Sequence, residues 1–74
     1  MTYKELVRET LSDGRVHAIN DLLCLVDPPA SRDYLHKCVA EIKQELDPVG
    51  EDIVCVFSRR RTHYRWVRVI TSGE

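Results

Sequence analysis

The spacing of apolar residues at the start of the chain predicts a helix over residues 2–14, TYKELVRETLSDG. Apolar side chains recur three and four positions apart, which places them on one helical face. They are Tyr3, Leu6, Val7 and Leu11. Thr2 is expected to cap the first turn together with Glu5 three residues later, the arrangement called a capping box. Gly14 suits the left-handed conformation that commonly follows a helix.

The segment after this helix predicts a short extended stretch and a second helix. Residues 15–20, RVHAIN, contain β-branched side chains and are expected to form an isolated strand or an extended link. Asn20 is then expected to cap a helix of about two turns over residues 21–26, DLLCLV. The two prolines that follow Asp27 end this helix, because proline cannot continue a helix and disfavours helical geometry in the residue before it.

A third helix is predicted over residues 32–46, RDYLHKCVAEIKQEL, with Ser31 as its N-cap. Its apolar residues again follow helical spacing and predict one buried face. They are Leu35, Cys38, Val39, Ile42 and Leu46. The amphipathic pattern therefore gives this helix a core side and a polar side.

The remainder of the chain predicts a β-hairpin. DPVGED at residues 47–52 reads as a turn, and residues 53–57 and 63–70 are rich in β-branched and aromatic residues. The polar loop SRRRT, residues 58–62, lies between these two strands. We therefore expect a single α+β domain over residues 1–74, a winged helix-turn-helix with three helices plus a C-terminal β-hairpin wing.

From Ser31 onward the chain resembles the C-terminal half of OmpR/PhoB-type DNA-binding effector domains. That family has a recognition helix of pattern V-x-x-x-I-x-x-L-R-x-x-L and a hairpin of pattern I-x-T-V-R-G-x-G-Y-x-L. This chain has LHKCVAEIKQEL at residues 35–46, IVCV at 53–56 and YRW at 64–66. The glycines of the family's wing are missing, and Lys43 replaces the arginine of its third helix. The resemblance implies a DNA-binding winged helix, with helix 31–46 in the major groove.

Charge is distributed unevenly along the chain, although its formal net charge is only −1. Residues 1–56 carry six Lys or Arg against eleven Asp or Glu, whereas residues 57–70 carry five arginines and no acid. Three of those arginines, Arg59, Arg60 and Arg61, are consecutive in the predicted hairpin loop. Local fields rather than net charge attract polyanions, so the wing is a candidate for contact with the DNA backbone or minor groove. The alternative is a solvated turn that discourages aggregation at the strand edge.

The candidate DNA-binding residues combine the polar side of the third helix with the wing, since Arg, Lys and Gln can read base edges and Arg suits phosphate. They are Arg32, His36, Lys37, Ala40, Lys43, Gln44, Arg59, Arg60, Arg61 and Arg65. Acidic residues in the same helix, including Glu41 and Glu45, favour instead a solvated face. Tyr64 and Trp66 either stack on unpaired bases or, as is more common, fill the core.

We expect a small DNA-binding protein that acts as a transcriptional regulator on double-stranded DNA, with a homodimer as one option. The alternative is a winged-helix protein-interaction module, an adaptor or small inhibitor that engages a protein partner and not DNA. The sequence contains no catalytic motif, so we expect no enzyme activity and no cofactor. The odd number of cysteines, at Cys24, Cys38 and Cys55, reads as reduced and mostly buried thiols rather than metal ligands. With no apolar targeting or membrane segment, a cytoplasmic protein is expected.

Overall fold

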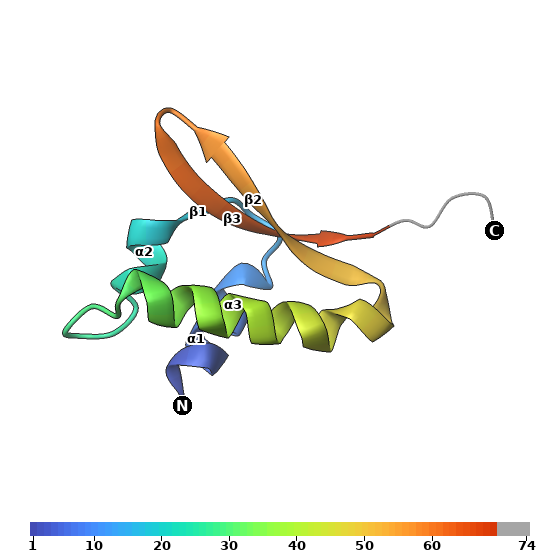
Figure 1. Ribbon diagram of the computed structural model, residues 1–74, viewed down its shortest axis with the longest axis horizontal. Coiled ribbons are helices and arrows are strands. Elements are labelled where there is room, and N and C mark those ends of the chain that lie inside the picture. Colours follow the sequence, from blue (N-terminus) through green and yellow to red (C-terminus); the bar gives the residue numbers. More distant parts are fainter. Residues whose placement is uncertain (70–74) are drawn as a thin grey trace.

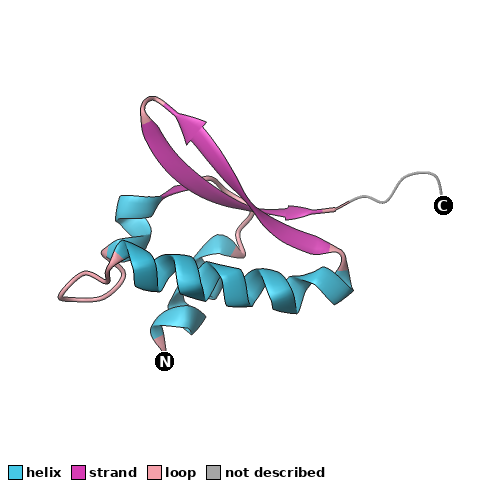
Figure 2. Ribbon diagram, in the orientation of Figure 1, coloured by secondary structure: helices cyan, strands magenta, loops and turns pink. Residues whose placement is uncertain are grey.

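The computed structural model describes residues 1–69 and shows an α+β arrangement of three helices and a three-stranded antiparallel sheet (Figures 1 and 2). The elements are α1 (Tyr3–Leu11), β1 (His17–Ala18), α2 (Ile19–Leu23), α3 (Arg32–Leu46), a 3-10 turn (Asp47–Val49), β2 (Glu51–Ser58) and β3 (Arg61–Arg68). Ile70, the last residue of the predicted second strand, lies outside the described residues.

The helix α1 starts as the sequence predicts. The Thr2 hydroxyl oxygen accepts a hydrogen bond from the Glu5 backbone N–H at 3.2 Å, and the Thr2 backbone N–H donates to the Glu5 carboxylate at 3.1 Å. This reciprocal pair is the capping box. Gly14 has a φ of 76°, the left-handed conformation expected of it. Both sequence predictions are confirmed.

The helix α2 differs from the prediction at both ends. It begins at Ile19 rather than at Asp21 and ends at Leu23, and its N-cap is Ala18, which makes no side-chain capping bond. Asn20, the predicted cap, lies inside the first turn. The physical reason is tertiary, because β1 pairs with β3 through Ala18 and the chain then turns at once to bury Ile19 in the core. The 15–20 segment is therefore joined to the sheet and is not an isolated strand.

The helix α3 matches its prediction over Arg32–Leu46. The Ser31 hydroxyl accepts a hydrogen bond from the Tyr34 backbone N–H at 3.2 Å, so Ser31 is the N-cap. All five predicted core residues of this helix are buried: Leu35, Cys38, Val39, Ile42 and Leu46. After the 3-10 turn, Gly50 with a φ of 75° redirects the chain into β2.

The sheet has the strand order β1-β3-β2, so β3 lies in the centre. Side chains alternate between the two faces of a strand, which puts Ile53, Trp66 and Tyr64 on the face that packs against the helices. The hairpin then continues past the helices, as the orange tip in Figure 1 shows. Phe57, on that same face but nearer the tip, is 74% exposed because no helix covers it.

The hairpin loop is shorter than predicted. The strands continue to the Ser58–Arg61 pair, so the loop is only Arg59 and Arg60 and not the five residues 58–62. Both turn residues have positive φ, 52° and 63°. Two-residue hairpin loops with positive φ at both positions match the right-handed twist of the strands, which is why this turn closes the hairpin. Asn and Gly favour that conformation, whereas arginine adopts it only with strain.

A buried contact fastens α1 to α2. The Tyr3 hydroxyl donates a hydrogen bond of 2.8 Å to the backbone carbonyl of Leu22, and the Tyr3 ring stacks on Tyr34 with centroids 5.4 Å apart. The core thus joins all three helices beneath one face of the sheet. No helix within residues 1–69 is long and apolar enough to cross a membrane.

Candidate nucleic-acid interface

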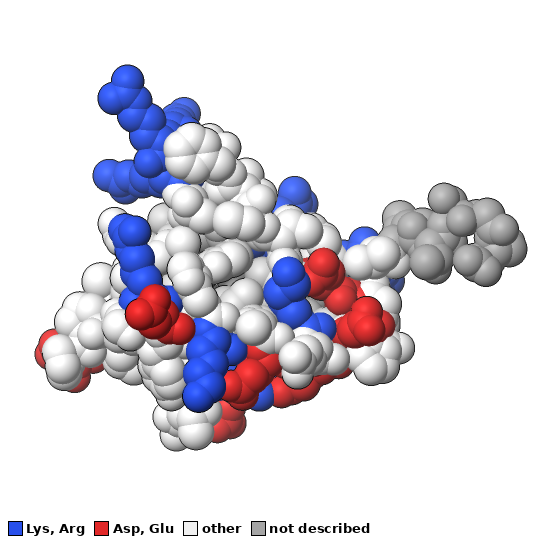
Figure 3. Space-filling view, viewed as in Figure 1, with Lys and Arg blue, Asp and Glu red and all other residues white. Residues whose placement is uncertain are grey.

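Three consecutive arginines cover the end of the hairpin, and we call Arg59, Arg60 and Arg61 the tip arginines. All three are exposed, and none forms an ion pair with an acidic residue of the part of the chain that the structure describes. Figure 3 shows basic side chains projecting from the tip, with no acidic side chain beside them on that face. Positive charge is therefore concentrated at the tip of the hairpin.

The turn geometry spreads the tip arginines over two sides of the hairpin. Arg59 lines a groove with Val16 and His63, whereas Arg60 lines a separate pocket beside the start of α3. Arg61 borders both. The three arginines therefore line different surroundings although they are adjacent in sequence.

A row of candidate residues on α3 faces the hairpin. Arg32, His36 and Lys43 lie on one side of the helix, because they are separated by four and by seven residues, about one and two helical turns. The His36 ring lies edge-on to Tyr64 of β3, with centroids 6.3 Å apart, and Lys43 Nζ is 3.9 Å from Asp52 of β2. These contacts place the row beneath the hairpin, on the side from which the tip projects.

The remaining candidates on α3 lie further around the helix. Ala40, Lys37 and Gln44 are exposed on its outer side. Asp33 is also exposed there, four residues before Lys37, and it forms no ion pair with any residue in the range 1–69. The outer side is thus mixed in charge, in contrast to the tip of the hairpin.

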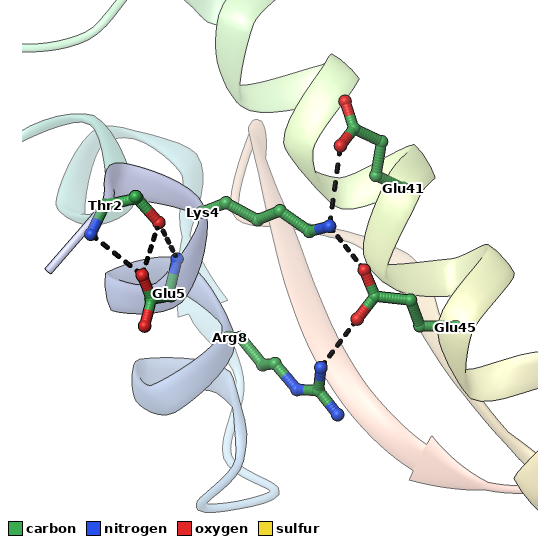
Figure 4. Close-up of polar contacts among 6 residues, drawn as sticks. All are labelled: Thr2, Lys4, Glu5, Arg8, Glu41 and Glu45. Carbon is green, nitrogen blue, oxygen red and sulfur yellow. Dashed lines mark hydrogen bonds and ion pairs between the residues drawn. The ribbon is translucent and has the colours of Figure 1, made fainter.

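The other acids of α3 are turned toward α1 (Figure 4). Glu45 forms ion pairs with Lys4 and with Arg8, the latter at 2.6 Å, and Lys4 also lies 3.5 Å from Glu41. The hydrogen bond from Lys4 lowers the pKa of Glu45, and the same bond raises the pKa of Lys4. Glu41 and Glu45 are therefore paired with basic residues of α1, on the side of α3 away from the hairpin, whereas Asp33 is not.

Arg65 is separated from the other candidates. Its neighbours in β3, Tyr64 and Trp66, pack against the core, so Arg65 lies on the opposite face of the sheet. Its Nε–H donates a hydrogen bond of 3.1 Å to the backbone carbonyl of Gly14. The half-buried Tyr64 and Trp66 fill the core, which favours the packing interpretation over base stacking, and burial raises the pKa of Tyr64.

Sequence reasoning missed two polar residues that accompany the arginines. Asn20 and Thr62 line the same pocket as Arg32 and Arg60. The sequence indicates only a helix cap at Asn20 and a loop position at Thr62. No local pattern joins these four positions, because the pocket forms only when the hairpin folds over the start of α2 and α3.

The cysteines differ from the prediction. Cys38 is buried, but Cys24 and Cys55 are exposed, so the expectation of mostly buried thiols was wrong. Cys24 ends α2, and Cys55 lies where β2 extends beyond the cover of the helices. Within residues 1–69 no group of three His, Cys, Asp or Glu side chains is placed to hold a metal ion.

Comparison with protein families, with curated proteins and with solved structures found no match for this chain.

Proposed function

We propose that this chain is a winged helix-turn-helix protein that binds double-stranded DNA and acts as a transcriptional regulator. In this proposal α2 and α3 are the helix-turn-helix, α3 enters the major groove, and the β2–β3 hairpin is the wing. The tip arginines contact the backbone or the minor groove. A second copy on a two-fold site would add affinity, because one small domain makes few phosphate contacts.

The observation that carries the proposal is the separation of charge across α3. Glu45 is paired with Lys4 and Arg8 on the α1 side, while Arg32 and Lys43 lie on the hairpin side. Lys43 is itself paired with Asp52 at 3.9 Å, whereas Arg32 and the tip arginines form no ion pair within residues 1–69, so the uncompensated positive charge on this side lies at the start of α3 and at the hairpin tip. Phosphates along a duplex attract clustered cations and release counterions when bound, so this distribution supports contact with nucleic acid.

Binding to labelled random-sequence duplex DNA, followed by fluorescence anisotropy at several salt concentrations, tests this function. Wild type is expected to bind more weakly as salt rises. The double variant Arg59→Asn, Arg60→Asn is expected to lose at least roughly tenfold in affinity and to reduce the salt slope by about two. Asn is chosen because it tolerates positive φ.

The matched control is Arg15→Gln, Arg68→Gln, which also removes two exposed charges but leaves the tip intact. It is expected to retain most of the affinity. Equal losses of duplex affinity in the two double variants would mean that binding depends on net charge and not on the wing. That result would contradict the proposal.

One observation favours a protein-interaction module as the second candidate. The outer edge of β2 pairs with no strand among residues 1–69, and Phe57 on that strand is exposed. An unpaired edge with an exposed aromatic side chain can accept a strand from another protein. Two results together would establish this candidate. Wild type would show no salt-dependent DNA binding at tens of micromolar, and Phe57→Ser would abolish capture of a protein partner.

A further inference from the structure

A small pocket lies between the hairpin tip and the starts of α2 and α3. Its volume is about 160 Å³. It is lined by Ala18, Ile19, Asn20, Arg32, Arg60, Arg61 and Thr62. This volume corresponds to about five water molecules, so the pocket suits a compact ligand.

The chemistry of the lining points to an anion. Three arginines, Arg32, Arg60 and Arg61, line the pocket, and no acidic residue of the range 1–69 lines it. The nearest acids in sequence, Asp21 and Asp33, form no ion pair with these arginines in the described range. Like charges that gather without a counter-charge repel one another, and a bound anion removes that repulsion.

The donors match the shape of a phosphate group in particular. Each guanidinium presents a planar fork of N–H donors that fits two oxygens of a phosphate. Asn20 and Thr62 also line the pocket, and their side chains carry neutral amide and hydroxyl donors. Donors that converge from several directions can serve the oxygens of a tetrahedral anion together.

Regular structure fixes the backbone positions of the three arginines. Arg32 is the first residue of α3 after the Ser31 cap, and Arg61 pairs with Ser58 in the hairpin. Arg60 occupies the second position of the two-residue turn, with a φ of 63°. An anion site built on fixed backbone positions requires less reorganisation when the ligand binds.

We propose that this pocket binds one phosphate group through Arg32, Arg60 and Arg61. A phosphate of the DNA backbone is one source, and this assignment rests on the proposed function. A small phosphate ester is the other source. In either case the bound group links the hairpin tip to the first turn of α3 and fixes the angle between the wing and the helix.

The first arm of the test uses inorganic phosphate and needs no DNA. The side-chain N–H signals of Asn20 and of the arginines are followed by NMR in the full chain, with sodium chloride at matched ionic strength as the screening control. Wild type is expected to saturate with a dissociation constant on the order of 1–10 mM. Arg60→Asn and Arg32→Gln are expected to bind at least about tenfold more weakly.

Arg59→Asn is the matched control, because it removes the neighbouring charge at the same turn but does not line the pocket. It is expected to bind phosphate as wild type does. If wild type does not saturate, or if Arg59→Asn weakens binding as much as Arg60→Asn, the pocket proposal is wrong, even where the chain still binds duplex DNA.

The second arm measures duplex binding by the same variants and identifies the source. If Arg60→Asn and Arg32→Gln weaken duplex binding more than Arg59→Asn does, the pocket holds a backbone phosphate. If phosphate saturates the pocket but wild type binds no duplex, the pocket stands, its source is a small phosphate ester, and the proposed DNA function fails.

Discussion

The Arg8 guanidinium on α1 lies 2.6 Å from the Glu45 carboxylate on α3. The two residues are 37 positions apart in the sequence, and Lys4 shares the same carboxylate. This contact turns an acidic residue of α3 toward α1 and leaves Arg32 and Lys43 on the hairpin side of the helix. The proposed interface depends on this separation of charge within one helix.

Acid is expected to weaken the α1–α3 contact. The pKa of Glu45 in the folded state is held below its ordinary value of 4.5, mainly by the hydrogen bond from Lys4. Its stabilising contribution is therefore complete above that ordinary value and is lost as pH falls through the lower folded pKa. Urea unfolding of wild type between about pH 5 and pH 3 should show falling stability, and Glu45→Gln should show a shallower fall. Glu9→Gln, which removes an exposed acid that forms no ion pair within residues 1–69, is the control. Equal slopes for wild type and Glu45→Gln would contradict the expectation.

Removing the Tyr3 hydroxyl is expected to destabilise the fold. Tyr3 donates its hydrogen bond to the Leu22 carbonyl in a buried setting, and Tyr3→Phe leaves that carbonyl only the longer 3.4 Å bond from the Leu25 backbone N–H. The expected loss in free energy of unfolding is about 0.5–1.5 kcal/mol, measured by urea denaturation. Tyr34→Phe, at a half-exposed position, should change stability by less than about 0.5 kcal/mol. Similar losses in both variants would show that the buried bond is not the cause.

A turn with better conformational preferences should stabilise the hairpin and weaken DNA binding. Arg59→Asn, Arg60→Gly places Asn-Gly at two positions that both have positive φ. The gain in free energy of unfolding should be at least roughly 1 kcal/mol, because strain at two non-glycine positions is relieved. Arg61→Asn, in the strand, should give no gain. A double variant that is no more stable than wild type would refute the idea that Arg59 and Arg60 hold strained backbone.

Arg65 is expected to contribute less to DNA binding than the tip arginines. Its Nε–H is bonded to the Gly14 carbonyl, on the sheet face opposite the core. Arg65→Gln should therefore lower duplex affinity less than Arg60→Asn does. The affinities of the two variants should differ by a factor of roughly ten. Anisotropy titrations of both variants at one salt concentration make the comparison. A larger loss for Arg65→Gln would place the interface on the outer face of the sheet.

Local signals were enough to predict most of the secondary structure. Ser31 and the helical spacing that follows it fixed both ends of α3, and Thr2 with Glu5 fixed the start of α1. The start of α2 was missed because Asn20 has a strong capping preference, whereas the pairing of Ala18 with His63 decided where the helix begins. That pairing joins positions too distant for local preferences to indicate.

The candidate site was predictable in charge but not in geometry. The run of tip arginines stands out in the sequence, but arginine gives no signal for a two-residue turn with positive φ. The pocket that joins Asn20, Arg32 and Arg60 depends on how the hairpin folds over the helices. The pairing of Glu45 with Lys4, 41 residues away, likewise follows from helix packing and not from local sequence.

The most direct test of the DNA-binding proposal is an NMR titration of the isotopically labelled chain with duplex DNA, observing every backbone amide. The largest changes are expected to cluster at the tip arginines and along the hairpin side of α3, from Arg32 to Lys43. The amides around Lys4 and Arg8 on α1 should change least. Changes centred on α1 or on the outer edge of β2, with the tip unaffected, would contradict the proposed interface.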